Sequence, residues 1–122
     1  MTVVYHEVLP ESYLLILAPG RTGDTVPEVA LAHSLRCAER SGKAAVWVDC
    51  GMLNSLSREA AELLWASYHH LLTNQSQLVL VHVPDRVRKT LLDRGPGMEP
   101  CIVPTLMDAA RQPAAQLGQQ HL

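Results

Sequence analysis

A carboxylate, a thiol and two hydroxyls lie close together in this sequence, directly after the apolar run Ala44–Cys50. A carboxylate can accept a phosphoryl group, a thiol can act as a nucleophile, and a hydroxyl can be phosphorylated. In open α/β sheets, ligands and partners are usually bound at the loops that leave the carboxyl ends of the strands. We therefore expect the functional face around Asp49–Arg58. The candidate residues in sequence order are Asp49, Asn54, Ser55, Ser57, Arg58 and Glu59.

An enzyme could be built here only around Cys50. His82 or His69 would serve as its base, since adjacent parallel strands could bring Cys50 and His82 close together. However, no third group that would orient the base is evident, and a neighbouring negative charge such as Asp49 disfavours a thiolate. We expect no enzyme and no catalytic residue.

Metal ions and cofactors are not expected either. The three cysteines, Cys37, Cys50 and Cys101, are odd in number and far apart, which argues against a disulfide framework and structural zinc. Cys37 is expected in the core or at its boundary. His69 and His70 are adjacent, so on a helix they point about 100° apart and cannot chelate one ion as an i, i+4 pair can.

The elements that position these groups are a strand and a helix. Ala44–Cys50 is short, apolar and rich in Val, which predicts a buried central strand. The segment from Ser57 to about Leu72 has apolar residues at helical spacing. A serine before such a segment can accept hydrogen bonds from the free N–H groups of the first turn, so Ser57 is a predicted N-cap.

The remaining elements follow from the same patterns. Two β-rich runs around a short polar turn predict an N-terminal hairpin with a mixed edge strand, and later apolar runs alternate with helical patterns. The order β-β-α-β-α-β-α-β-α predicts an α/β fold whose mostly parallel sheet has one antiparallel edge strand and packed helices. The expected elements are Val3–Leu9, Tyr13–Ala18, a helix from about Asp24 to Ser41 stopped by Gly42, the strand and helix above, Leu78–Val83, Pro84–Gly95, Cys101–Val103 and a helix from Thr105.

Size and composition restrict the class of protein. A chain of 122 residues is long enough for one core and too short for two, so we expect one domain over residues 1–111 and a loose tail over 112–122. With 48% hydrophobic residues and a net charge of −2, the chain is neither disordered nor a basic binder of nucleic acid. No apolar run has membrane-spanning length and no signal peptide is evident, so a cytosolic protein that does not bind membranes is expected.

The order of these elements resembles the STAS domain family (sulfate transporter and anti-sigma factor antagonist). The resemblance covers nearly the whole chain and rests on the order and spacing of soft motifs. It implies a single-domain STAS-like fold. The matching features are Gly20 and Asp24 in a Gly-x-x-Asp-like loop, Val46–Asp49, Ser57–Leu64, Leu78–Val83, Pro84–Gly95 and Ile102–Ala110.

The resemblance also implies a function. Such bacterial domains are non-catalytic regulators of transcription that bind a kinase-type anti-sigma factor, or a related regulator, through the second helix and nearby loops. Phosphorylation of a Ser or Thr in an Asp-Ser-Ser/Thr-Gly motif commonly releases that partner. Here Ser57-Arg58-Glu59-Ala60 lies at the motif, so Ser57 replaces the Asp and Arg58 and Glu59 replace the hydroxyl residues. Ser55 or Ser57 could be modified instead, or Ser57 could serve only as the helix cap.

Three alternatives stay open at this stage. A receiver-like domain would take a phosphoryl group on Asp49, but it also needs an acidic pair and a Lys, and the first loop offers only Asp24. A small-ligand binder would use the loop Pro19–Asp24 and the strand ends. The edge strand Val3–Leu9 could also pair with a second copy to form a homodimer.

Overall fold

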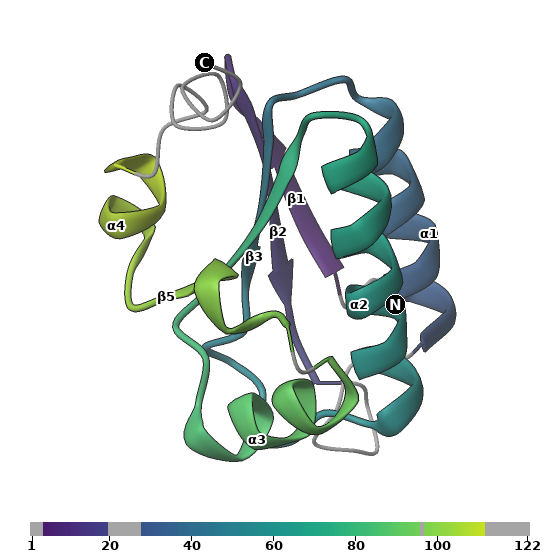
Figure 1. Ribbon diagram of the computed structural model, residues 1–122, viewed down its shortest axis with the longest axis vertical. Coiled ribbons are helices and arrows are strands. Elements are labelled where there is room, and N and C mark those ends of the chain that lie inside the picture. The colour runs from purple at the N-terminus through teal and green to yellow at the C-terminus, as the bar shows by residue number, and fades with distance from the viewer. Residues whose placement is uncertain (1–3, 20–27, 96, 112–122) are drawn as a thin grey trace.

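The computed structural model describes residues 4–19, 28–95 and 97–111, and they form a five-stranded sheet with helices on both faces (Figure 1). The predicted loop that holds Asp24 and the predicted tail 112–122 lie outside these residues. In chain order the elements are β1 (Val4–Val8), β2 (Ser12–Leu17), α1 (Glu28–Arg40), β3 (Ala45–Asp49), α2 (Arg58–Thr73), β4 (Gln77–Val81), α3 (Asp85–Arg94), the 3₁₀ helix η1 (Glu99–Cys101), β5 (Ile102–Val103) and α4 (Leu106–Arg111).

The sheet has the simplest strand order, β1-β2-β3-β4-β5, with β1 antiparallel to β2 and all other pairs parallel. The register aligns Asp49 of β3 with Ile16 of β2 and with Val81 of β4. The carboxyl ends of the three central strands therefore meet at one edge of the sheet. This topology and its antiparallel edge strand confirm the fold class predicted from the sequence.

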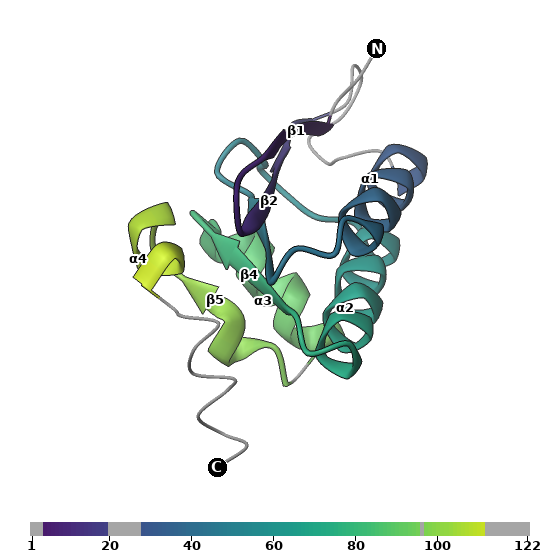
Figure 2. The same ribbon diagram turned by 90° about the horizontal axis from the view of Figure 1, so that it is seen from above.

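Alternate side chains of the strands point to the two faces of the sheet, and each face has its own cover. Helices α1, α2 and α3 pack on the face that carries Leu15, Val48 and Leu80, which are fully buried. Helix α4 packs on the opposite face against Val79 and Val81 (Figure 2). Burial on both faces explains why β3 and β4 read as continuous apolar runs rather than alternating ones.

Three local predictions needed correction. The strand expected over Leu78–Val83 ends at Val81, because His82 adopts a left-handed conformation with φ 53° that breaks the extended chain. Cys101 was expected in the last strand but lies in the 3₁₀ helix before it. Cys37 was expected in the core or at its boundary and is exposed on α1. The stop predicted at Gly42 is confirmed, since its φ is 74°, as a left-handed helix end requires.

The last helix is held at its start by local hydrogen bonds. The backbone N–H of Thr105 donates to the Asp108 carboxylate at 3.1 Å, and the Asp108 N–H donates to the Thr105 hydroxyl at 3.2 Å. This reciprocal pair is a capping box with Asp in place of Glu. Within the described ranges, no helix is long and apolar enough to cross a membrane.

The end of α3 predicts a sensitive glycine. A Cβ added at Gly95 would lie 2.5 Å from Cε3 of Trp65 and 2.8 Å from Sδ of Met98, so Gly95→Ala should lower the free energy of unfolding by about 1–3 kcal/mol. A Cβ at Gly97 would meet Trp65 at an ordinary 3.5 Å, so Gly97→Ala is the matched control and should cost less than about 0.5 kcal/mol. Urea denaturation measures both, and equal stabilities of the two variants would contradict the packing described.

Candidate functional site at the start of helix α2

Ser57 is the N-cap of α2. Its backbone is extended, with φ −71° and ψ 158°, and its hydroxyl oxygen accepts a hydrogen bond from the Ala60 N–H at 3.1 Å. The same hydroxyl donates to Oε2 of Glu28, the first residue of α1, at 3.4 Å. The Ser57 side chain thus serves the helix and links it to α1, which confirms the predicted cap.

The loop before α2 has two buried leucines that point into the core and polar residues between them that are accessible to solvent. Leu53 and Leu56 are buried in the core, so they hold the loop in one conformation. Asn54 is exposed and Ser55 is half-buried between these two anchors. Arg58 and Glu59 are exposed in the first turn of the helix.

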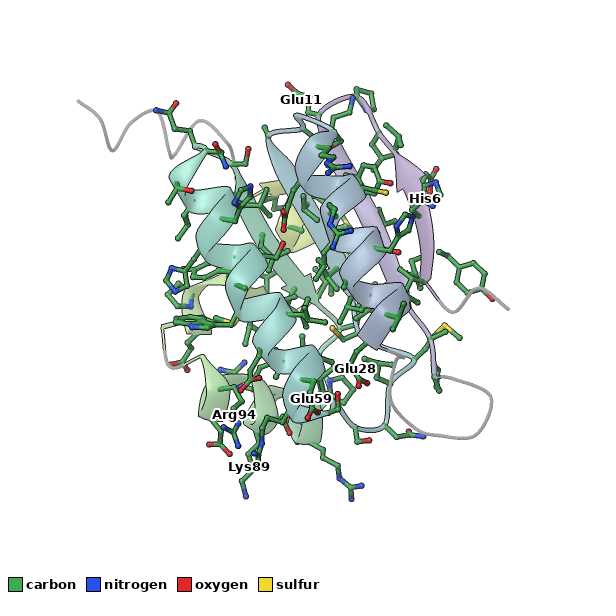
Figure 3. The ribbon with its side chains drawn as sticks, turned by 90° about the vertical axis from the view of Figure 1, so that its right-hand side faces the viewer. His6, Glu11, Glu28, Glu59, Lys89 and Arg94 are labelled. Atoms are coloured by element: carbon green, nitrogen blue, oxygen red, sulfur yellow. The ribbon has the colours of Figure 1, made fainter. Side chains whose placement is uncertain are left out.

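Two carboxylates lie at the positive end of the α2 dipole. Glu59 occupies the first turn of α2, and Glu28 approaches from the start of α1 (Figure 3). Negative charge at a helix N-terminus is stabilising by about 0.3–1 kcal/mol. The site is therefore already anionic without any modification of Ser57.

Asp49 lies at the carboxyl end of β3, apart from the Ser57 cap. One of its oxygens, Oδ1, accepts the Gly51 N–H at 2.9 Å and lies 3.3 Å from Nδ1 of His82. The left-handed backbone of His82 brings its ring to this carboxylate, and its own N–H donates to the Pro104 carbonyl at 3.2 Å. These contacts give Asp49 a structural task in joining the ends of β3, β4 and β5.

Cys50 is poorly suited to nucleophilic chemistry. Burial, and secondarily the charge of Asp49, raise the pKa of this thiol to about 12, and burial raises the pKa of Cys101 to about 12 as well. At neutral pH both thiols are protonated, and the thiolate is the reactive form. His82, the base considered for Cys50, is instead directed toward Asp49.

The structure brings only part of the predicted site together. Ser57, Arg58 and Glu59 lie at the start of α2, whereas Asp49 belongs to a separate cluster and Asp24 lies outside the described residues. In the part of the chain that the structure describes, no group of three His, Cys, Asp or Glu side chains could hold a metal ion.

Sequence reasoning had not placed Glu28 at the site. Its position at the start of the preceding helix was the available signal, because right-handed parallel crossovers place successive helices side by side on one face of a sheet. The structure places its carboxylate against the Ser57 hydroxyl. Glu28 therefore joins the candidate site.

Several solved structures have the same fold as this chain. The unphosphorylated anti-sigma factor antagonist SpoIIAA aligns with a TM-score of 0.71 at 12% identity, over 88% of this chain and 96% of that one. A single-residue variant of RsbS from Moorella thermoacetica aligns with a TM-score of 0.75 at 12% identity, over 95% of this chain and 97% of that one. The chain has the STAS fold. A match to SLC26A9, with a TM-score of 0.64 at 12% identity, covers 90% of this chain and 21% of that one.

No protein-family model and no curated protein matches the sequence itself. At such low identity the fold survives because it depends on the pattern of buried positions rather than on individual residues. A likeness at 12% identity extends to the fold and not to the function.

The N-cap predicts a measurable loss of stability. Ser57→Ala removes the acceptor of the Ala60 N–H and should lower the free energy of unfolding by about 1 kcal/mol. Ser55→Ala is the matched control, since Ser55 lies in the same loop outside the cap, and it should change stability by less than about 0.5 kcal/mol. If urea denaturation gave the two variants the same midpoint, the capping role of Ser57 would be wrong.

The cysteines predict an ordered pattern of alkylation. At neutral pH, iodoacetamide should modify Cys37, which is exposed, and leave Cys50 and Cys101 unmodified until urea unfolds the chain. Peptide mass mapping locates the label, and Cys37→Ser should abolish labelling of the folded protein. Rapid stoichiometric labelling of Cys50 in the folded protein would restore the enzyme hypothesis.

Proposed function

We propose that this STAS domain is a non-catalytic regulatory module that binds a protein partner through the start of α2. The observation that carries the proposal is the exposed first turn, Arg58 and Glu59, fixed on a capped helix next to Glu28. The fold supports it, because solved structures with this fold include anti-sigma factor antagonists. The proposed partner is a kinase-type anti-sigma factor or a related regulator, in the cytoplasm.

The proposed docking surface extends beyond the first turn. Asn54 and Ser55 lie in the adjoining loop, and Asp24 is included because the Gly-x-x-Asp-like loop belongs to the order of motifs through which the sequence resembles the family. Asp49 supports this surface indirectly by fixing Gly51 at the beginning of the loop.

Phosphorylation of Ser57 is not part of this proposal. A phosphate there would bring nearly two negative charges close to the Glu28 carboxylate, which lies 3.4 Å from the hydroxyl. Repulsion between two unit charges at that distance amounts to about 1–5 kcal/mol for dielectric constants between about 80 and 20. The favourable interaction of the phosphate with the positive end of the helix dipole contributes only about 0.3–1 kcal/mol.

A receiver-like role for Asp49 is less well supported. Its Oδ1 is engaged by the Gly51 N–H and by His82, and the side chain is only 18% exposed. A phosphoryl transfer to Oδ1 would have to displace those contacts.

Affinity capture from the native cell tests the proposed function. Tagged protein should retain an anti-sigma-type kinase or related regulator, and Arg58→Ala/Glu59→Ala should reduce the recovered amount at least about tenfold. Glu11→Ala is the matched control, because Glu11 is exposed at the far end of the molecule (Figure 3). Equal recovery by all three proteins, or no specific regulator in any of them, would overturn the proposal. Intact-mass measurement of the native protein should show no added phosphate.

A further inference from the structure

A groove runs between α1 and α2 on the side that faces away from the sheet. At its first end it is a hollow of about 450 Å³ whose apolar lining residues are Val29, Ala32 and Leu63. Ala32 and Leu63 also line a second hollow further along the same helices, which continues past Leu35 and Ala66. The two hollows share Ala32 and Leu63 and therefore form one groove, whose apolar lining residues are Val29, Ala32, Leu35, Leu63 and Ala66. It is defined here by these apolar residues and is called the α1–α2 groove.

The first end of the α1–α2 groove is acidic. Glu28, Glu59 and Glu62 line it, and none of the three forms an ion pair with a cation of residues 4–19, 28–95 or 97–111. Val29, which lines the same hollow, is 86% exposed and so presents apolar surface beside these carboxylates. Carboxylates around exposed apolar surface fit a partner that is both apolar and basic.

The second end of the groove differs in charge. There Glu39 accepts a hydrogen bond from the buried Ser67 hydroxyl at 2.6 Å and lies 3.7 Å from Nε2 of His70, and Arg36 also lines the wall. This carboxylate is engaged within the protein, and a guanidinium accompanies it. The groove is therefore acidic at one end only, so it can orient an occupant.

We propose that the α1–α2 groove binds an amphipathic helix of a partner protein, with an apolar stripe against the apolar lining residues and lysines or arginines near Glu28, Glu59 and Glu62. From Val29 to Glu39 the groove follows about ten residues of α1, which is about 15 Å at about 1.5 Å per residue. That length accommodates about three turns of a helix, a common unit of helix-in-groove recognition. The inference rests on the proposed function, because the acidic end contains Glu59 of the docking turn.

A synthetic peptide provides the probe. It is a helix of about 15 residues built from Leu, Ala and Lys, with leucines spaced along one face and about four lysines in one half. A second peptide carries Glu in place of every Lys. Titration of the ¹⁵N-labelled protein should show that only the basic peptide binds, with shifts concentrated at Val29, Ala32, Glu62 and Leu63.

Matched variants separate the groove from net charge. Glu59→Lys and Glu11→Lys each change the net charge by the same amount, but only Glu59 lines the groove. Glu59→Lys should weaken peptide binding at least about fivefold, whereas Glu11→Lys should weaken it less than about twofold. Val29→Gln changes no charge, does not disturb the core because Val29 is exposed, and should weaken binding at least about threefold.

Every other outcome overturns the inference. No binding, equal binding of the acidic peptide, equal effects of Glu59→Lys and Glu11→Lys, or shifts outside the groove would each exclude it. Sedimentation of the protein alone tests another occupant: a dimer dissociated by Val29→Gln would show that a second copy fills the groove. If a captured regulator loses affinity with Arg58→Ala but not with Val29→Gln, the groove inference fails while the proposed function stands.

Discussion

Burial of β3 between two parallel neighbours is the constraint on which the rest of this structure depends. Val46 and Val48 are fully buried beneath the helices, and Cys50 continues the same interior surface beyond the strand. After β3 the chain leaves the sheet at the carboxyl end of the strand. There the Asp49 carboxylate accepts a hydrogen bond from the Gly51 N–H, which stabilises the turn that follows. Leu53 and Leu56 return to the core, and the segment before Ser57 is left with few alternative paths.

The Ser57 cap determines which side chains lie together at the start of α2. The Ser57 hydroxyl contacts both the first turn of α2 and Glu28 of α1. These contacts hold the starts of α1 and α2 together. Their carboxylates are then concentrated at one end of the groove between the helices. The same side chains explain why the site needs no phosphate to be anionic.

Much of the fold was predictable because its signals are local. The central apolar run, the Ser57 cap and the Gly42 stop each depend on residues a few positions apart, and these three formed as predicted. Predictions failed where residues far apart in the sequence determine the local conformation or the exposure of a side chain. The strand expected to continue through His82 ends early, since its turn is joined to Asp49 and Pro104. Cys37 looked like a core residue by type, yet its position on α1 faces solvent.

The sequence by itself determined the order of the elements, the parallel sheet and the segment that holds the candidate site. It could do so because hydrophobic periodicity and helix capping depend on residues that are close together in the chain. Only the tertiary structure decided which polar groups meet. Glu28 and Ser57 are 29 positions apart and touch only because α1 and α2 pack side by side. Likewise Asp49 is separated from His82 along the chain, and parallel pairing of β3 with β4 brings them together. Such contacts follow from packing of whole elements, which no local pattern specifies.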